Sequence, residues 1–306
     1  MINEFVQFHP LGADTVCNFT LTAEGTKPVV LSLNKQQYTL LHNRLVRQYL
    51  VLCNETRMCD MIESAPNYQE LERIAKKYSL CDTCDFSDIN IYGLKRSLKV
   101  VVRILYKYPK LRGKFCYIGS PNGYRKKIEQ LAKGNLDILK DFGIQYICQT
   151  DIAVQLGRLM RHIAHDILSE KDSYIAMAVY AYGLFDAILL DDNDYEGYAY
   201  IKLVSNLKHE AISGFHPHGC HTVESVMYHE IGHLIDYLCK LSENPELLAY
   251  VSGLSQHDIA TGLSLYATTS TRELIAEGFA EYICNETPRQ IARKIGNIID
   301  AEYSKL

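Results

Sequence analysis

Hydrophobic residues recur at helical spacing in one stretch of the chain, from about Thr222 to Leu241. The apolar positions of this stripe are Val223, Met227, Ile231, Leu234 and Leu238. Thr222 suits the N-cap position, and Glu224 in the first turn complements the helix dipole. The pattern therefore predicts an amphipathic helix with one face in the core and another face that carries polar side chains.

The same patterns predict further helices and short strands. β-rich runs around Glu24-Gly25-Thr26 predict a hairpin within residues 17–33, and Asn34 suits the cap of a helix that ends near Leu52. The other predicted elements are helices over 66–80, 94–108, 124–142 and 152–168 and strands over 115–118 and 184–190. The polar stretch 81–88 is the predicted boundary. We therefore expect a small α/β accessory region of hairpin plus helices over residues 1–80 and an α+β domain over residues 81–306.

The polar side of the first helix carries His229-Glu230-Ile231-Gly232-His233. Residues four apart on a helix differ by about 40° in azimuth and about 6 Å in rise, so both imidazoles lie on one face and can share an ion. Glu230 lies about 100° further round, beside the metal rather than on it. This pattern is typical of zinc peptidases, in which two imidazoles hold Zn²⁺ and the carboxylate polarises a water. Chance produces it in roughly one chain in fifty, but histidines away from the apolar stripe are hard to explain as packing.

A second predicted helix supplies further acidic groups. Glu273, Glu277 and Glu281 are spaced four apart, so they share one face of a helix whose N-cap is Ser270 or Thr271. Three stacked carboxylates repel one another. A nearby cation or a solvated face must therefore relieve them.

The residues around the two histidines decide the class of the site. Metzincins need Gly and His three and six residues after the second histidine, but those positions hold Asp236 and Cys239. Three segments instead resemble the lethal-factor-like gluzincin metalloproteases: 229–236, 264–267 and 273–282. That group includes the anthrax toxin protease, the secreted Pro-Pro endopeptidases and zincin domains in phage head or mobile-element proteins. The resemblance is specific over about residues 214–282 and extends back to about Phe86, and the segment 214–219 is most similar to the phage-type members.

The resemblance implies a zincin-like metalloprotease domain with a small mixed sheet, and it assigns roles to five residues. The ligands of Zn²⁺ correspond to His229, His233 and Glu273, and the general base corresponds to Glu230. Tyr266, seven residues before Glu273, corresponds to the tyrosine that stabilises the oxyanion. The implied activity is hydrolysis of peptide bonds in a protein or peptide substrate by metal-activated water.

Two further carboxylates suit outer positions around the metal. Metal-bound histidines usually donate the other ring N–H to a carboxylate or carbonyl, which fixes the tautomer. Glu277 matches such a carboxylate in the family, and Asp236, one turn beyond His233, is a candidate for the same role. The alternative for Asp236 is a solvent-facing position on the helix.

Two functions of different class remain open from the sequence. The first is the zinc endopeptidase. The second is a non-catalytic, phage-derived or structural module that keeps zinc for stability and makes protein contacts. The presence of all five expected active-site residues favours the enzyme.

Composition and the N-terminal sequence indicate the class of protein and its expected location. The chain has 306 residues, 47% hydrophobic content and a net charge of −4, as expected for a globular protein that does not bind polyanions in general. The N-terminus lacks a secretory signal pattern, so we expect a cytoplasmic protein, with virion association or export by a non-classical route as alternatives. The longest apolar segment, residues 175–190, contains Asp186 and is too short to predict a membrane span.

Four cysteines are candidates for a second metal site. Cys81 and Cys84 are the only close pair among the 10 cysteines, and Cys53 and Cys59 could complete a four-thiolate zinc site with them. The spacing matches no known zinc ribbon. The default expectation is therefore scattered, reduced thiols.

Three other polar segments have weaker functional interpretations. Residues 95–128 contain 11 Lys or Arg and no acidic residue, which suits an acidic or phosphate-bearing partner or simply the solvated faces of two helices. His216, His218 and His221 are expected in an entry loop near the cleft. The acidic residues 191–194 lack an EF-hand pattern and predict a turn.

Overall fold

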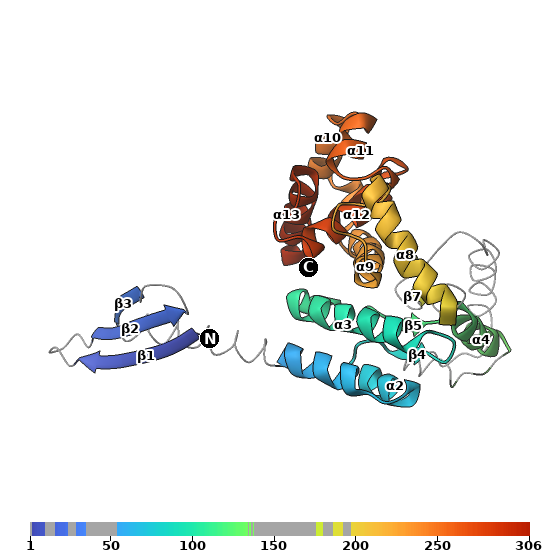
Figure 1. Ribbon diagram of the computed structural model, residues 1–306, viewed down its shortest axis with the longest axis horizontal. Helices are drawn as coiled ribbons and strands as arrows, with labels where there is room; N and C mark the ends of the chain where they lie inside the picture. The colour runs from blue at the N-terminus through green and yellow to red at the C-terminus, as the bar shows by residue number, and fades with distance from the viewer. Residues whose placement is uncertain are drawn as a thin grey trace. The chain divides into compact units, whose positions relative to one another are not determined.

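The computed structural model describes residues 2–9, 16–23, 29–34, 54–133, 135, 137, 176–179, 186–191 and 197–306 (Figure 1). The chain divides into two compact units, Met1–Arg57 and Met58–Leu306. The prediction placed the division after residue 80. The difference arises because residues 58–80 contribute Ile62, Leu71 and Ile74 to the core of the larger unit.

The smaller unit contains a three-stranded antiparallel sheet. Its strands are β1 (Ile2–His9), β2 (Val16–Ala23) and β3 (Val29–Asn34), in the order β1-β2-β3. The β2–β3 pair, in register from Val16 opposite Asn34 to Leu21 opposite Val29, confirms the two strands of the predicted hairpin. Strand β1 was not predicted. The expected turn at 24–26 and the expected helix from Asn34 to Leu52 lie outside the described residues.

The larger unit contains a small mixed sheet. Its strands are β4 (Thr83–Asp85), β5 (Tyr117–Gly119), β6 (Ala176–Val179) and β7 (Ala187–Leu190). They lie in the order β4-β5-β7-β6, with β4, β5 and β7 parallel and the edge strand β6 antiparallel to β7. Both predicted strands of this unit are present, as β5 and β7, with shifted ends. All four residues of β7 are buried, which suits a strand covered on both faces.

The predicted boundary at 81–88 is wrong, because this stretch contains β4. Cys84 and Phe86 are buried, and the Thr83 N–H donates to the Cys116 carbonyl. Because this stretch is polar, the three-residue strand β4 was not predicted. Its partner β5 lies more than thirty residues later, so no local pattern could identify the pairing.

Helices α2 (Tyr68–Lys77) and α4 (Pro121–Ala132) contact this sheet. The other elements of this part of the chain are the helix of residues 54–64, which crosses the division between the units, α3 (Ile91–Lys107) and the 3₁₀ turn η1 (Pro109–Leu111). Asn67 caps α2 and Asn90 caps α3 through side-chain oxygens. Helices α2 and α3 confirm two predictions, and α4 matches the described part of a third. The predicted helix at 152–168 lies outside the described residues.

The C-terminal part of the chain is helical and carries the residues singled out from the sequence. The elements are α8 (Gly197–Ser213), α9 (Val223–Cys239), η2 (Leu241–Glu243), α10 (Pro245–Ser252), α11 (Gln256–Gly262), η3 (Tyr266–Thr268), α12 (Thr271–Cys284) and α13 (Gln290–Lys305). Helices α9 and α12 pack against each other, and α3 and α13 also contact α9 (Figure 1). The predicted α+β class is confirmed: the larger unit is mostly helical, with one small mixed sheet.

Helices α9 and α12 approach each other closely where Gly232 meets Ala276. A Cβ atom at Gly232 would lie 2.9 Å from the Cα of Ala276 and 3.3 Å from its carbonyl oxygen. A side chain at this position would therefore collide with backbone. The glycine of the histidine motif thus sets the distance between the two helices. Within the described ranges, no helix is long and apolar enough to cross a bilayer.

Candidate metal centre

Helix α9 presents both histidines of the motif on one side. Thr222 is the N-cap, as predicted, and its hydroxyl accepts from the Ser225 N–H in a capping box. Four residues of the apolar stripe are buried in the core, with Met227 and Ile231 fully inaccessible, and Leu238 is half-buried against it. The imidazole rings of His229 and His233 lie 4.7 Å apart between centroids and nearly perpendicular, at 85°.

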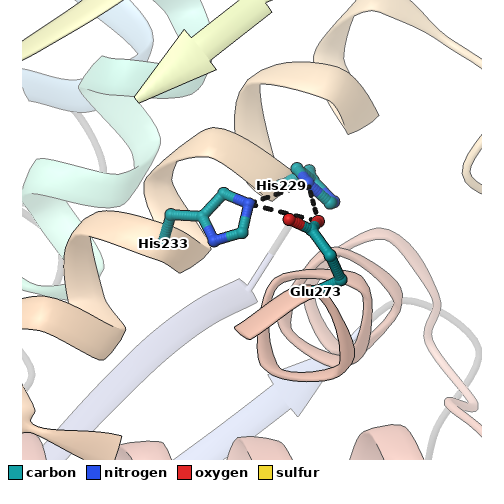
Figure 2. A group of neighbouring side chains, drawn as sticks. All are labelled: His229, His233 and Glu273. Atoms are coloured by element: carbon teal, nitrogen blue, oxygen red, sulfur yellow. Dashed lines mark hydrogen bonds and ion pairs between the residues drawn. The ribbon is translucent and has the colours of Figure 1, made fainter. Parts of the chain in front are cut away.

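Helix α12 brings one glutamate to these rings (Figure 2). Ser270 caps the helix, as predicted, so Glu273 lies in the first turn and its side chain extends toward α9. Its Oε2 lies 3.1 Å from Nε2 of His229 and 3.3 Å from Nε2 of His233. The two Nε2 atoms are themselves 3.1 Å apart. Two imidazole nitrogens and one carboxylate oxygen therefore converge on a single point.

This donor set fits a bound cation. A tetrahedral zinc ion with bonds of about 2.0–2.1 Å has donors about 3.3–3.4 Å apart, close to the three observed separations. Oε2 of Glu273 is buried and has no hydrogen bond of good geometry among the described residues, although two ring nitrogens face it. The side chains of His229, His233 and Glu273 are only 12%, 14% and 21% exposed. In the described part of the chain this is the single cluster that could hold a metal ion.

The charges in the cluster shift the pKa values of its members. Burial opposes a charge on His229, but the carboxylates of Glu273 and Glu277 outweigh burial and raise its pKa to about 10. Burial alone would raise the pKa of Glu273, whereas the two facing histidines hold it well below its ordinary value. His229, His233 and Glu273 thus compete for the same protons. A metal cation between them would interact favourably with all three.

Glu277 lies behind His229 and accepts from its other nitrogen. Its Oε1 is 2.8 Å from Nδ1 of His229, and its Oε2 accepts from the Ser264 hydroxyl at 2.8 Å. Nδ1 of His216 lies 3.2 and 3.3 Å from the two oxygens. Burial opposes the charge of Glu277, but hydrogen bonds from His216 and His229 lower its pKa to about 2. The side chain therefore has the orienting contact predicted for it.

Glu230 is buried beside the cluster and does not belong to it. Burial raises its pKa, while the nearby His229 and His233 and a hydrogen bond from the Ala178 N–H lower it in part. Ala178 belongs to the edge strand β6. The carboxylate is thus held between the histidine helix and the edge of the sheet, as expected for a group that acts next to a metal rather than on it.

Tyr266 lies next to His229. Its ring centroid lies 5.9 Å from that of His229 and 5.4 Å from that of Phe215. The Tyr266 N–H donates to the Phe215 carbonyl at 3.0 Å, which ties η3 to the loop that precedes α9. Burial and the carboxylates of Glu273 and Glu230 raise its pKa to about 12, so the phenol keeps its proton and can donate it.

Asp236 differs from its prediction. Its Oδ1 accepts from the backbone N–H of Ser242 at 2.7 Å, and no described contact joins it to a ring nitrogen of His233. The side chain is buried, so the alternative of a solvent-facing position is also wrong. Helix α9 ends at a left-handed residue, Lys240, and Asp236 satisfies an N–H of the reversed chain.

The three stacked carboxylates of α12 each have their own set of partners, although His229 contacts two of them. Glu273 faces the two motif histidines, and Glu277 is bound by His229, His216 and Ser264. Glu281, 1% exposed, forms an ion pair of 2.7 Å with Arg289, and Arg289 also donates to the carbonyl oxygens of Thr261 and Leu263. Among the described residues the expected cation is present for Glu281, as Arg289, and for Glu273 a bound cation stays a prediction. The roles of His216, Ser264 and Arg289 were not predicted, because each of these side chains meets its glutamate across a loop or turn whose path the local pattern does not specify.

The remaining candidates give mixed outcomes. Cys59, Cys81 and Cys84 form no metal-binding cluster where the structure describes them, and Cys53 lies outside the described residues. His218 and His221 are exposed, and only the backbone carbonyl of His218 is bonded, by Asn285. Of the predicted acidic turn, only the first residue is described.

Part of the basic segment 95–128 is engaged within the fold. Arg96 pairs with Glu224 at 2.8 Å, and Lys99 pairs with Glu63 at 2.7 Å. Lys107 lies over the ring of Tyr282. These contacts give several cations structural partners, and an acidic or phosphate-bearing ligand stays a prediction.

Comparison of this chain with models of protein families, with curated proteins and with solved structures found no match. The function of the site is therefore inferred from its own geometry.

Proposed function

We propose that this chain is a zinc-dependent endopeptidase of the gluzincin type, with a zincin-like catalytic domain in its larger unit. One observation carries the proposal. His229, His233 and Glu273 converge from two helices on a point that fits a metal, while Glu230 lies beside that point without entering the donor set. A zinc site that only stabilised the fold would not need a buried carboxylate next to the ion that does not coordinate it.

The three donors suit zinc by type and number. Two neutral imidazoles and one carboxylate leave a fourth position open, as in catalytic rather than structural zinc sites. Zinc bound there would supply Lewis acidity that makes a water nucleophilic near neutral pH.

The surrounding residues have complementary tasks. Glu230, whose pKa is raised by burial, accepts a proton from the attacking water and returns it to the leaving amine. Tyr266 keeps its proton and donates a hydrogen bond to the oxyanion that develops from the scissile carbonyl. Glu277 orients His229 so that Nε2 faces the metal position.

The edge strand β6 suggests how a peptide reaches this site. Among the described strands it is the last of the sheet, and its Ala178 N–H binds the proposed general base. An extended peptide can pair with the edge of a strand through main-chain hydrogen bonds. The substrate class proposed is therefore an extended segment of a protein or peptide.

Digestion of a broad peptide library, analysed by mass spectrometry, tests the proposal. Wild-type protein should contain one zinc per chain and cleave a defined set of sequences. Glu230→Gln should retain zinc and fold but lose turnover, because the amide preserves shape and lacks basicity. Glu243→Gln, the same change at an exposed position in η2, is the matched control and should cleave like wild type. Zinc without any turnover would favour a structural module, and absence of zinc would refute the proposal.

A further inference from the structure

His216 lies outside the donor set but close to it, in the loop between α8 and α9. Its side chain is 20% exposed, and its Nδ1 lies 3.2 and 3.3 Å from the two oxygens of Glu277. Its Nε2 lies 3.7 Å from Oε2 of Glu210, a buried oxygen without a hydrogen bond in the described part of the chain. The imidazole therefore stands between two carboxylates, one on α8 and one on α12.

The contact with Glu277 affects a residue that touches the metal cluster. Glu277 is 2% exposed and, when ionised, can only accept hydrogen bonds. It is held by His229 on one oxygen, by Ser264 on the other and by His216 across both. Loss of the His216 donor would leave a buried carboxylate under-satisfied and free to rotate away from His229.

We infer that His216 is a positioning residue of the metal centre, which acts through Glu277 on the orientation of His229. The inference rests on the proposed function only for the presence of a metal. The chain of contacts runs from Glu210 to His216, then to Glu277 and His229. Groups that hydrogen-bond a metal ligand directly, as Glu277 does, typically contribute about 10–100-fold to metal affinity, and the effect of His216, which is transmitted through Glu277, is bounded by that range.

The loop is built to hold this histidine in place. Gly214 has a φ of +79°, a conformation that favours glycine, and the Phe215 N–H donates to the Glu210 carbonyl at 2.9 Å. The Leu265 N–H donates to the Gly214 carbonyl at 2.9 Å, which anchors the loop to the segment before Tyr266. The His216 ring then packs edge-on against Tyr266, with centroids 5.5 Å apart.

Zinc affinity of His216 variants, measured by chelator competition at fixed pH on the full chain, tests the inference. His216→Ala should bind zinc more weakly than wild type, by up to about 10–100-fold. His216→Asn places an amide N–H near the position of Nδ1 and should restore most of the affinity. His216→Gln places its amide near the position of Nε2, toward Glu210, and should not restore it.

A double-mutant cycle separates action through Glu277 from a general effect on the loop. In a Glu277→Gln background, His216→Ala should cause little further loss of zinc affinity, because the contact it removes is already changed. A merely structural histidine would instead lower the thermal midpoint of the metal-free protein and leave zinc affinity unchanged in both backgrounds. His218→Asn, a matched change at an exposed position of the same loop, should behave like wild type.

The outcomes distinguish this inference from the proposed function. Wild-type protein that binds no zinc would overturn both. Wild-type protein that binds zinc, with His216→Ala binding it equally well, would overturn the inference alone. If His216→Ala does not fold, the comparison of the Asn and Gln variants decides, and equal affinities of those two would overturn the inference.

Discussion

Gly232→Ala tests whether the approach of α9 to α12 controls the metal centre. The new Cβ would lie 2.9 Å from the Cα of Ala276 and 3.3 Å from Cβ of Phe279. Carbon atoms pack at about 3.5–4.0 Å, so the shortfall at Ala276 is about 0.6 Å or more. Because the obstacle is backbone, no side-chain rotation can remove the clash, and the helices must separate.

This separation should affect both stability and zinc binding. Overpacking of a well-packed interior costs about 1–3 kcal/mol of unfolding free energy. Glu273 reaches the histidines from α12, so a rigid shift of about 0.6 Å exceeds the roughly 0.2 Å tolerance of metal–ligand distances. We therefore expect Gly232→Ala to weaken zinc binding by at least about tenfold as well as to destabilise the metal-free protein.

Urea unfolding followed by circular dichroism, with and without chelator, measures the first effect, and chelator competition measures the second. Gly253→Ala is the matched control, because its Cβ would meet nothing closer than the Tyr250 carbonyl oxygen at 3.4 Å. The control should be neutral or slightly stabilising. A Gly232→Ala protein that matches wild type in both unfolding free energy and zinc affinity would refute the argument that this contact sets the helix separation.

Three further predictions concern the candidate metal centre and the carboxylates of α12. Glu273→Gln should weaken zinc by several orders of magnitude, whereas Glu277→Gln should cost about 10–100-fold; chelator competition would show the reverse order if the two carboxylates have been assigned the wrong way round. Tyr266→Phe should retain zinc and lower kcat on a cleaved peptide by about 10²–10³, and an unchanged rate would remove it from the site. Arg289→Met leaves a buried carboxylate unpaired and should lower the unfolding free energy by about 3 kcal/mol in urea titrations. Lys294→Met, at an exposed ion pair, should lower it by less than about 1 kcal/mol; equal losses would contradict this burial argument.

Elements governed by local sequence were predictable. The period of apolar residues and the hydroxyl of Thr222 define α9, and the hydroxyl of Ser270 defines the start of α12. Because residues four apart share a helix face, the pairing of His229 with His233 needed no tertiary information. The position of Glu273 at the cluster was different: it was carried over from a resemblance, and the geometry places it there independently.

Features that depend on distant contacts were not predictable. Strand β4 has three residues, and its polar flanks indicated a linker until its partner β5 was known. Asp236 was expected to bind a histidine, yet the reversal of the chain after α9 placed the Ser242 N–H within its reach. The position of a carboxylate on a helix specifies its face, whereas the donor it meets depends on the loops that pass that face.

The burial of the three glutamates of α12 explains why only one of them is suited to a metal. Exposure falls along the helix, from 21% for the Glu273 side chain to 2% for Glu277 and 1% for Glu281. A fully buried carboxylate needs a permanent partner during folding, and the two deeper ones have histidine and arginine side chains. Glu273 is the most exposed of the three, so it does not need a permanent partner and can bind an exchangeable cation. Because Arg289 also donates to the carbonyl oxygens of Thr261 and Leu263, its ion pair with Glu281 fixes the segment that leads to Tyr266. The candidate metal ligand at one end of α12 and the proposed oxyanion donor are thus held in register by a contact two turns away.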